Sequence, residues 1–426
     1  MNDATRFDVV IVGAGPAGLA AAVTASAGTS SIALIDEGSA PGGQIWRRDS
    51  RTGHSLEGRE WMKALERTPV TVLDRATVVD ASVGGGRHRL LIQRERRTLA
   101  VESATVILAT GARELFLPFP GWTLPGVLGV GGAQAMAKAG LDVRGRRVVV
   151  SGTGPLLVAV AAGLARRGAE IEAVVEQAPV SRMLRFMGAL AGKPRTALEA
   201  LRFAQELRGG TVRFGSWVTE ARGREALERV VVTDGATRQV LDCDLLCTAY
   251  GLVPNTELAR LMGCHGDARG VAVDAHQRTS VTGVFAAGEC AGIAGVEAAL
   301  IEGMVAAEAA VGIPPSAFVQ RRRDQARRWG TMLDRAFALR PDVLALARPD
   351  TIVCRCEDVR LGALDESWTR RQAKLYARAG MGACQGRVCG AALERLRGWG
   401  EDVVRAPLIP VSLSTLARPA GASGAH

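Results

Sequence analysis

Several features that define common classes of protein are missing from this sequence. Aromatic residues make up only 4% of its 426 residues, and no apolar segment approaches the roughly 20 residues that a membrane-spanning helix needs. The first residues lack a basic stretch followed by an apolar one, so no secretion signal is expected. These absences argue against a transmembrane or secreted protein and predict a chain that functions in the reducing cytoplasm.

The positive charge is poorly organised for binding nucleic acid. Basic residues exceed acidic ones by 10, but the arginines are scattered and aromatic side chains do not alternate with them, so we expect no nucleic-acid partner. The densest group is Arg321–Arg323 with Arg327 and Arg328. It falls in an expected helix, and it is interpreted either as a solvated face or as a docking face.

What the chain has in abundance is glycine. The 51 glycines and 47% hydrophobic residues favour an α/β fold with tight strand-to-helix turns. An expected strand at residues 8–12 leads into Gly13-Ala14-Gly15-Pro16-Ala17-Gly18, and an alanine-rich helix follows to about residue 27. A second strand at residues 31–35 ends in Asp36. This order of elements predicts a dinucleotide-binding fold.

Each residue of this motif has a physical role in binding a dinucleotide. Gly13 permits the turn, Gly15 lets backbone N–H groups approach a pyrophosphate, and Gly18 lets the helix pack close to the strand. The N-terminus of the helix adds partial positive charge beside the phosphates. Asp36 is placed to accept hydrogen bonds from ribose hydroxyls, with Glu37 as the alternative acceptor.

A second, imperfect copy of the motif begins at residue 147. An expected strand at 147–151 is followed by Gly152-Thr153-Gly154-Pro155-Leu156-Leu157, a helix, and a strand at 171–175 that ends in Glu176. Leu157 stands where the third glycine belongs, and its side chain would push the helix off the strand or crowd the phosphates. The second site, built on Gly152, Gly154 and Glu176, is therefore either a working NAD(P) pocket or a relic that could hold a mononucleotide.

Two more strand-to-turn segments complete the first fold rather than the second. They are Val106–Ala109 with Thr110-Gly111-Ala112, and Val284–Ala287 with Gly288-Glu289, after which a helix is expected at 291–310. This order predicts one α/β domain interrupted by another. The predicted parts are a discontinuous cofactor domain at 1–125 and 255–312, an inserted, degenerate nucleotide fold at 126–254, a helical linker at 313–349, a small helical cysteine module at 350–400 and an extended tail at 401–426.

Four of the eight cysteines fall within 36 residues and indicate a metal centre. Cys354, Cys356, Cys384 and Cys389 supply the four thiolates that a [2Fe–2S] cluster or a structural zinc takes. Spacing leaves that choice open, with free thiols as a third alternative. Nearby glycines and cations favour the cluster, because N–H groups and positive charge stabilise its sulfides: Gly380, Gly382, Gly386, Gly390, Arg355, Lys374, Arg378 and Arg387. The other cysteines, Cys243, Cys247, Cys264 and Cys290, are expected to be core thiols.

Together, the motifs give nearly the whole chain a resemblance to a known family. They are Gly13–Gly18, Pro41–Gln44, Gly111–Val127, Gly154–Leu157, Gly251–Asn255, Gly288-Glu289, Cys354–Val359 and Cys384–Gly390. The chain resembles the two-dinucleotide-binding-domain flavoproteins related to thioredoxin and glutathione reductases. In particular, it resembles the A subunit of opine oxidases, the hydrogen cyanide synthase flavoprotein subunit, and the FAD/iron–sulfur subunit of D-hydroxyproline and amino-acid dehydrogenases.

The resemblance implies FAD in the first site. It places Gly43 and Gln44 near the isoalloxazine ring and the Thr110-Gly111 turn along the cofactor, while Glu289 stands where related proteins have an aspartate that holds the ribityl chain. The cysteine segment resembles bacterioferritin-associated ferredoxin-like domains, which implies a [2Fe–2S] cluster. Ile45–Arg48 replaces the paired-cysteine sequence of glutathione-reductase-like enzymes, so disulfide reduction is not expected.

No catalytic residue can be identified in the sequence. The five histidines, His54, His88, His265, His276 and His426, lie in polar, loop-like contexts and are expected at the surface. The resemblance implies that a partner flavoprotein of the amino-acid-oxidase type oxidises the substrate, an opine, D-hydroxyproline, proline or a similar compound. This subunit would relay the electrons through its cluster and FAD to a quinone or another acceptor.

A small ferredoxin-like subunit is a further implied partner, and the partners could hold the protein at the inner membrane. Two other functions stay open. One is a stand-alone NAD(P)H-dependent reductase of an iron–sulfur partner, against which Leu157 argues. The other is a non-enzymatic assembly or redox-sensing protein. The sequence does not indicate the substrate or the stoichiometry.

Overall fold

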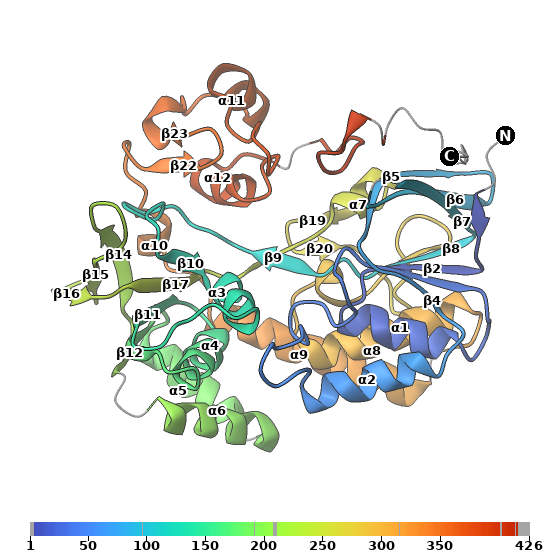
Figure 1. Ribbon diagram of the computed structural model, residues 1–426, viewed down its shortest axis with the longest axis horizontal. Helices are drawn as coiled ribbons and strands as arrows, with labels where there is room; N and C mark the ends of the chain where they lie inside the picture. Colours follow the sequence, from blue (N-terminus) through green and yellow to red (C-terminus); the bar gives the residue numbers. More distant parts are fainter. Residues whose placement is uncertain are drawn as a thin grey trace. The chain divides into compact units, whose positions relative to one another are not determined.

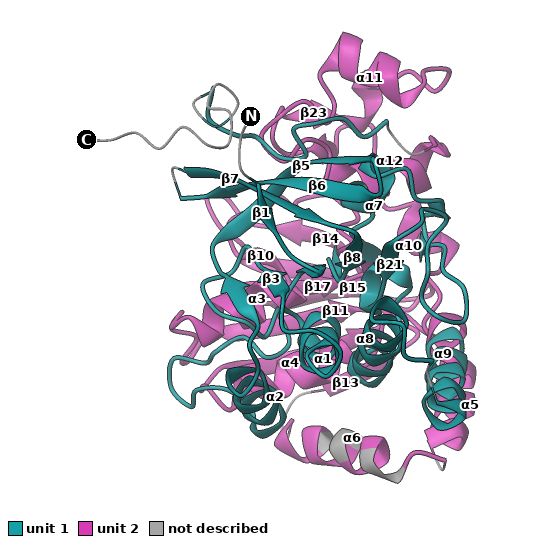
Figure 2. Cartoon of the chain, turned by 90° about the vertical axis from the view of Figure 1, so that its right-hand side faces the viewer, with its two compact units in different colours: residues 1–113, 253–331, 403–426 teal, residues 114–252, 332–402 magenta. Residues whose placement is uncertain are grey.

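The computed structural model describes residues 4–95, 97–190, 192–207, 211–314, 316–400, 403–413 and 415. The chain forms two compact units, each assembled from separate stretches of sequence (Figure 2). The first unit contains residues 1–113, 253–331 and 403–426, and the second contains residues 114–252 and 332–402. Strands β9 (Ala112–Glu114) and β18 (Leu252–Pro254) lie where the chain passes from one unit to the other and back.

The first unit is built around a five-stranded sheet in the order β21-β8-β2-β3-β4, in which all neighbouring strands are parallel. Helices α1 and α8 pack on one face, and the antiparallel strands β5 to β7 lie on the other (Figure 1). The remaining strand β1 extends this second sheet, whose order is β1-β7-β6-β5. The unit is therefore a three-layer α/β structure.

The elements of the first unit follow in chain order. They are β1 (Thr5–Arg6), β2 (Val9–Val12), α1 (Pro16–Ala25), β3 (Ile32–Ile35), α2 (Leu56–Glu66), β4 (Thr71–Leu73), β5 (Ala76–Gly84), β6 (Arg87–Arg94), β7 (Arg97–Ser103), β8 (Thr105–Leu108), α7 (Glu257–Leu261), β19 (Gly266–Asp267), β20 (Gly270–Val271), β21 (Val284–Ala286), the 3₁₀ turn η1 (Gly288–Ala291) and α8 (Val296–Ala310). Helix α9 (Ala317–Ala336) begins in this unit and ends in the second.

Strand β2 shows why this sheet is buried on both faces. Val10 lies in a cluster with Leu90 from β6, whereas the next residue, Ile11, lies in another cluster with Leu19 from α1. Successive side chains of a strand point to opposite faces, so an unbroken apolar run fills both cores at once. The tail also contributes, because Leu408 lies in the first of these clusters and its N–H donates to the Val79 carbonyl at 2.8 Å.

The second unit contains a five-stranded parallel sheet in the order β10-β17-β11-β12-β13 and an antiparallel sheet in the order β14-β15-β16. Helices α3 and α4 share a buried cluster with strands of the parallel sheet. The elements are β10 (Val127–Gly129), α3 (Val130–Lys138), β11 (Arg147–Gly152), α4 (Leu156–Ala165), β12 (Glu170–Glu176), α5 (Val180–Leu190), α6 (Pro194–Glu206), β13 (Thr211–Phe214), β14 (Trp217–Arg222), β15 (Arg229–Thr233), β16 (Arg238–Asp242) and β17 (Leu245–Ala249).

The cysteine segment belongs to the second unit and follows helix α10 (Pro341–Leu344). It contains β22 (Ile352–Cys354), β23 (Val359–Arg360), the 3₁₀ turn η2 (Leu361–Ala363), α11 (Arg370–Ala377) and α12 (Cys389–Arg397). These elements enclose a small apolar cluster that includes Val353, Leu393 and Trp399. The indole N–H of Trp122 donates to the Ile352 carbonyl at 2.6 Å and ties this segment to its unit. None of the helices in the described stretches is long and apolar enough to span a membrane.

Candidate functional site

The first glycine turn connects β2 to α1 with no space for larger side chains. The Gly13 N–H donates to the carbonyl of Ile35 at 2.8 Å. Gly13 has a φ of +103°, and a Cβ there would lie 2.2 Å from the carbonyl oxygen of Ala109. A Cβ on Gly18 would lie 1.7 Å from the carbonyl oxygen of Gly13. Only glycine fits at these two positions, because both backbones approach closer than any side chain allows.

The structure brings Asp36 and Gly43 to the same turn. The Asp36 carboxylate accepts the N–H groups of Ala14 at 2.6 Å and Gly38 at 2.8 Å. A Cβ on Gly43 would lie 2.9 Å from the Cα of Gly15, so these two glycines touch. An acidic group and bare backbone therefore meet at the N-terminus of α1, the arrangement that binds a ribose and a pyrophosphate.

Two other predicted residues of this site, Glu37 and Gln44, have exposed side chains. The Gln44 amide oxygen accepts the guanidinium of Arg47 at 2.9 Å. Trp46, in the segment that replaces a paired-cysteine sequence, is buried in the core beside α1.

The Thr110-Gly111 turn is fixed by Asn255, a residue whose role was not predicted. The Asn255 N–H donates to the Gly111 carbonyl at 2.9 Å, and its side-chain NH₂ donates to the Thr110 carbonyl at 2.9 Å. The Thr110 hydroxyl donates back to the Asn255 carbonyl at 2.7 Å. Arg113 donates to the Asn255 side chain and forms an ion pair with Glu257 at 3.0 Å. The only sequence signal for this role of Asn255 is its place in the motif Gly251–Asn255.

The Gly288-Glu289 turn is bonded to an ion pair whose carboxylate is buried. The Gly288 N–H donates to the carboxylate of Glu302 at 2.9 Å, and Arg327 donates to the other oxygen of that carboxylate at 2.8 Å. Glu302 is only 2% exposed, and burial raises its pKa while Arg327 opposes the rise. Burial also raises the pKa of Glu289. The turn thus contains one desolvated carboxyl group, that of Glu289, and a second carboxyl group, that of Glu302, accepts its backbone N–H.

Several arginines of the group in α9 contact other residues of the first unit. Besides Arg327, Arg322 forms an ion pair with Glu297 at 3.0 Å, and Arg323 donates to the Ala275 carbonyl. Arg321 and Arg328 remain exposed. The group is therefore partly solvated and partly engaged in contacts within the unit, and a docking role for a partner stays a prediction.

The second glycine turn has the expected shape but a different occupant at its third position. A Cβ on Gly152 would lie 1.9 Å from the Ala249 carbonyl oxygen, and Gly154 has a φ of +102°. The Glu176 carboxylate accepts the Gly154 N–H at 2.7 Å and the Thr153 hydroxyl at 3.0 Å. Leu157 is 1% exposed and lies in the core of this unit. Its side chain therefore fills the space between helix and sheet.

The chain after α9 is bonded to the same turn. The Thr153 hydroxyl contacts the Phe337 carbonyl at 3.0 Å, the Gln177 NH₂ donates to the Ala338 carbonyl at 3.2 Å, and the Arg340 N–H donates to the Gln177 side-chain oxygen at 2.9 Å. Gln177 is fully buried. Residues 337–340 therefore cover the carboxyl ends of β11 and β12, where a Rossmann fold binds the adenosine half of a dinucleotide.

The four clustered cysteines form two neighbouring pairs. Hydrogen bonding with the Cys389 thiol lowers the pKa of Cys354 to about 6, and the Gly380 N–H donates to the Cys354 sulfur at 3.4 Å. Cys356 is hydrogen bonded to Cys384. In the described part of the chain, no three Cys, His, Asp or Glu side chains are arranged to hold a metal ion. The pairs Cys354–Cys389 and Cys356–Cys384 therefore do not form a complete metal coordination sphere among the described residues.

The burial of the other four cysteines agrees with the prediction, and that of the histidines differs from it at one residue. Cys243, Cys247, Cys264 and Cys290 are all buried, which confirms that they are core thiols. The prediction that all histidines lie at the surface is wrong for His88, which sits in β6 and is buried. Its ring bonds to the Thr282 carbonyl at 3.1 Å, and burial lowers its pKa. His426 lies outside the described residues.

Comparisons with known proteins agree with this architecture. A family model described as pyridine nucleotide-disulphide oxidoreductase matches residues 7–311. The opine oxidase A subunit of Agrobacterium tumefaciens (strain Ach5) is 32% identical, with 96% of this chain and 91% of that protein covered. Hydrogen cyanide synthase subunit HcnB of Pseudomonas aeruginosa is 33% identical, with 95% and 97% covered. The solved structure of L-proline dehydrogenase from P. horikoshii shares the fold, with a TM-score of 0.71 at 20% identity over 98% of this chain and 81% of that one.

Proposed function

Because the chain belongs to the pyridine nucleotide-disulphide oxidoreductase family and is therefore an oxidoreductase, we propose that it is the FAD- and [2Fe–2S]-containing electron-transfer subunit of a hetero-oligomeric dehydrogenase. The similarity to HcnB and to the opine oxidase A subunit over nearly the whole chain supports this proposal. The substrate of the dehydrogenase is an amino or imino acid of the opine, D-hydroxyproline or proline type. A partner flavoprotein of the amino-acid-oxidase type oxidises that substrate, and this subunit passes the electrons to an acceptor. A small ferredoxin-like subunit is a further proposed partner.

The fit of the first site to FAD supports the proposal. Bare backbone at Gly13, Gly15 and Gly43 surrounds the N-terminus of α1, where a pyrophosphate would accept N–H groups. Asp36 would hold ribose hydroxyls, and the desolvated carboxyl of Glu289 would contact the ribityl chain. FAD bound there would accept two electrons at a time.

The single observation that carries the assignment is the covering of the second glycine turn by residues 337–340. Thr153 and Gln177, two side chains at the nucleotide edge of that fold, are hydrogen bonded to the chain itself. Leu157 also occupies the position that a third glycine needs. A reductase driven by NAD(P)H requires this site to be open. The reducing equivalents are therefore proposed to come from a partner protein.

The cysteine pairs support a [2Fe–2S] cluster by their donor chemistry. Cys354, Cys356, Cys384 and Cys389 are four thiols, and hydrogen bonding with Cys389 lowers the pKa of Cys354, which favours the thiolate form that binds a metal. The Gly380 N–H already donates to the Cys354 sulfur, as backbone groups do around cluster sulfurs. A cluster held by these residues would pass electrons one at a time.

The proposal is tested with the full-length protein purified without oxygen. Iron, acid-labile sulfide and FAD are quantified, and NADH or NADPH is then added while the flavin absorbance is followed. We expect about two iron atoms and one FAD per chain, and no bleaching by either nicotinamide. Bleaching is expected only after addition of a co-purified amino-acid-oxidase-like partner and its amino-acid substrate.

Two results would contradict the proposal. Bleaching within seconds by NADH or NADPH alone would favour a stand-alone reductase. Zinc in place of iron, with no visible absorbance beyond that of the flavin, would exclude the cluster and leave a flavin-only subunit. A Thr153→Val variant extends the nicotinamide test, because it removes the hydroxyl that contacts Phe337, Glu176 and Gln177 in the second unit.

A further inference from the structure

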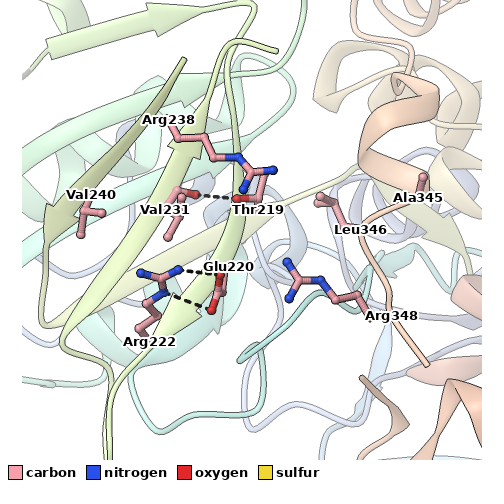
Figure 3. Close-up of a pocket in the computed structure, with 9 residues that line it drawn as sticks. All are labelled: Thr219, Glu220, Arg222, Val231, Arg238, Val240, Ala345, Leu346 and Arg348. Carbon is pink, nitrogen blue, oxygen red and sulfur yellow. Dashed lines mark hydrogen bonds and ion pairs between the residues drawn. The ribbon is translucent and has the colours of Figure 1, made fainter. Parts of the chain in front are cut away.

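A surface pocket in the second unit is lined by none of the residues of the two glycine turns and by none of the four clustered cysteines. It has a volume of about 310 Å³ and lies between the sheet β14-β15-β16 and residues 345–348, which precede the cysteine segment (Figure 3). The lining residues are Thr219, Glu220, Arg222, Val231, Arg238, Val240, Ala345, Leu346 and Arg348. A hydrogen-bonded turn between Arg348 and Thr351 joins the pocket to the start of β22.

Positive charge exceeds negative charge in this pocket. Three guanidinium groups line the pocket with one carboxylate, that of Glu220, which accepts two hydrogen bonds of 3.0 Å from Arg222. Figure 3 shows Arg348 on the other side of Glu220 and Arg238 beside Thr219. Within the described residues, the guanidinium groups of Arg238 and Arg348 make no hydrogen bond or ion pair to the protein. Both influence the charge of Glu220, since hydrogen bonding to Arg222 lowers its pKa and the charges of Arg348 and Arg238 add to that effect.

The rest of the pocket is apolar. Val231 and Val240 from neighbouring strands of the sheet, together with Leu346 from the facing segment, line it beside the arginines. A volume of about 310 Å³ is at the lower end of the range for small-molecule sites. Inorganic anions would use only the charged part, whereas a short aliphatic chain would fill the apolar part as well.

We propose that this pocket binds a small organic carboxylate with a branched aliphatic body. Arg238 and Arg348 receive the carboxylate through their planar forks, which match its geometry. Val231, Val240 and Leu346 contact the aliphatic part. Glu220 competes with the ligand for positive charge and so limits its affinity.

The proposal is tested by isothermal titration calorimetry of the cofactor-loaded full chain at low salt. The probes are 4-methylpentanoate, its uncharged amide, and inorganic phosphate. We expect saturable binding of the carboxylate at one site per chain, with the amide and phosphate each at least tenfold weaker. Arg238→Gln and Arg348→Gln should each weaken carboxylate binding roughly tenfold, the loss typical of one charge-assisted contact. Glu220→Gln should strengthen it several-fold, because the variant removes the competing charge and frees Arg222.

Arg229→Gln is the matched control. Arg229 lies on β15 of the same sheet and forms an ion pair with Asp242 at 3.2 Å, but it does not line the pocket. This variant should bind the carboxylate within twofold of the wild type. The proposal is overturned if the carboxylate does not bind, if phosphate binds equally well, or if Glu220→Gln weakens binding. Equal losses in Arg229→Gln and Arg348→Gln would show nonspecific attraction to the basic surface and would also overturn it.

Discussion

The ion pair between the buried Glu302 and the partly exposed Arg327 allows a quantitative prediction. Replacing Arg327 with Met keeps much of the side-chain volume but leaves the Glu302 carboxylate, 2% exposed, with the Gly288 N–H as its remaining partner among the described residues. Loss of one partner from a fully buried ion pair costs about 3–5 kcal/mol. Because the Arg327 side chain is 37% exposed and Glu302 can take up a proton, we expect a cost at or below the lower end of that scale, about 2–3 kcal/mol.

The same change should make stability depend on pH. Burial raises the pKa of Glu302 and Arg327 opposes the rise, so the variant has a still higher folded-state pKa. A carboxyl group whose pKa is higher in the folded than in the unfolded state makes the protein less stable as the pH rises. The loss of stability begins near the unfolded-state pKa of about 4.3 and continues up to the folded-state pKa. The deficit of Arg327→Met relative to the wild type should therefore be larger at pH 8 than at pH 5.5.

Urea unfolding followed by far-ultraviolet circular dichroism at both pH values measures these effects, with FAD retention after gel filtration as a second readout. Glu302→Gln is the control. It keeps an acceptor for the Gly288 N–H and carries no charge, so it should cost about 1 kcal/mol with little pH dependence. Equal costs for the two variants, or a deficit in Arg327→Met that shrinks toward pH 8, would refute the reasoning.

Three further changes test other parts of the structure. Leu157→Ala should destabilise the second unit by about 2–5 kcal/mol, because Leu157 is 1% exposed. Leu156→Ala is the control and should cost under about 1 kcal/mol, because Leu156 is 36% exposed. Thermal unfolding of both variants provides the comparison. Gly18→Ala places a Cβ 1.7 Å from a carbonyl oxygen, so the yield of soluble, yellow protein should fall at least tenfold, and a wild-type yield would contradict the packing. Cys354→Ser should reduce iron content to below half while FAD stays bound, whereas Cys264→Ser should leave iron unchanged, as measured by metal analysis and visible spectra.

The local patterns of the sequence predicted the central elements well. The order β2, α1, β3 and the corresponding order β11, α4, β12 follow from apolar runs separated by glycine turns, and these signals lie within 30 residues of one another. Helix α8 shows the limit of this approach. It was expected from residue 291 but begins at Val296, because Gly292 and Gly295 adopt positive φ values of 137° and 86° and a 3₁₀ turn comes first.

The contacts that fix the candidate sites could not be predicted in the same way. Arg327 was noted only as part of a charged group, since nothing local indicates that it meets Glu302 on another helix. Thr153 and the Phe337 carbonyl are separated by 184 residues, and no periodicity links such positions. His88 was misplaced because the polar residues around it in sequence alternate with apolar ones along a strand with one buried face, and its own side chain belongs to the inward-facing set.

The position of Leu408 has a practical consequence for engineering this chain. A truncated chain that ends at residue 400 would lack Leu408. The apolar cluster that contains Leu90 would lose this side chain, and the Val79 carbonyl would lose its N–H donor. Shortened versions should therefore retain the chain through Leu408.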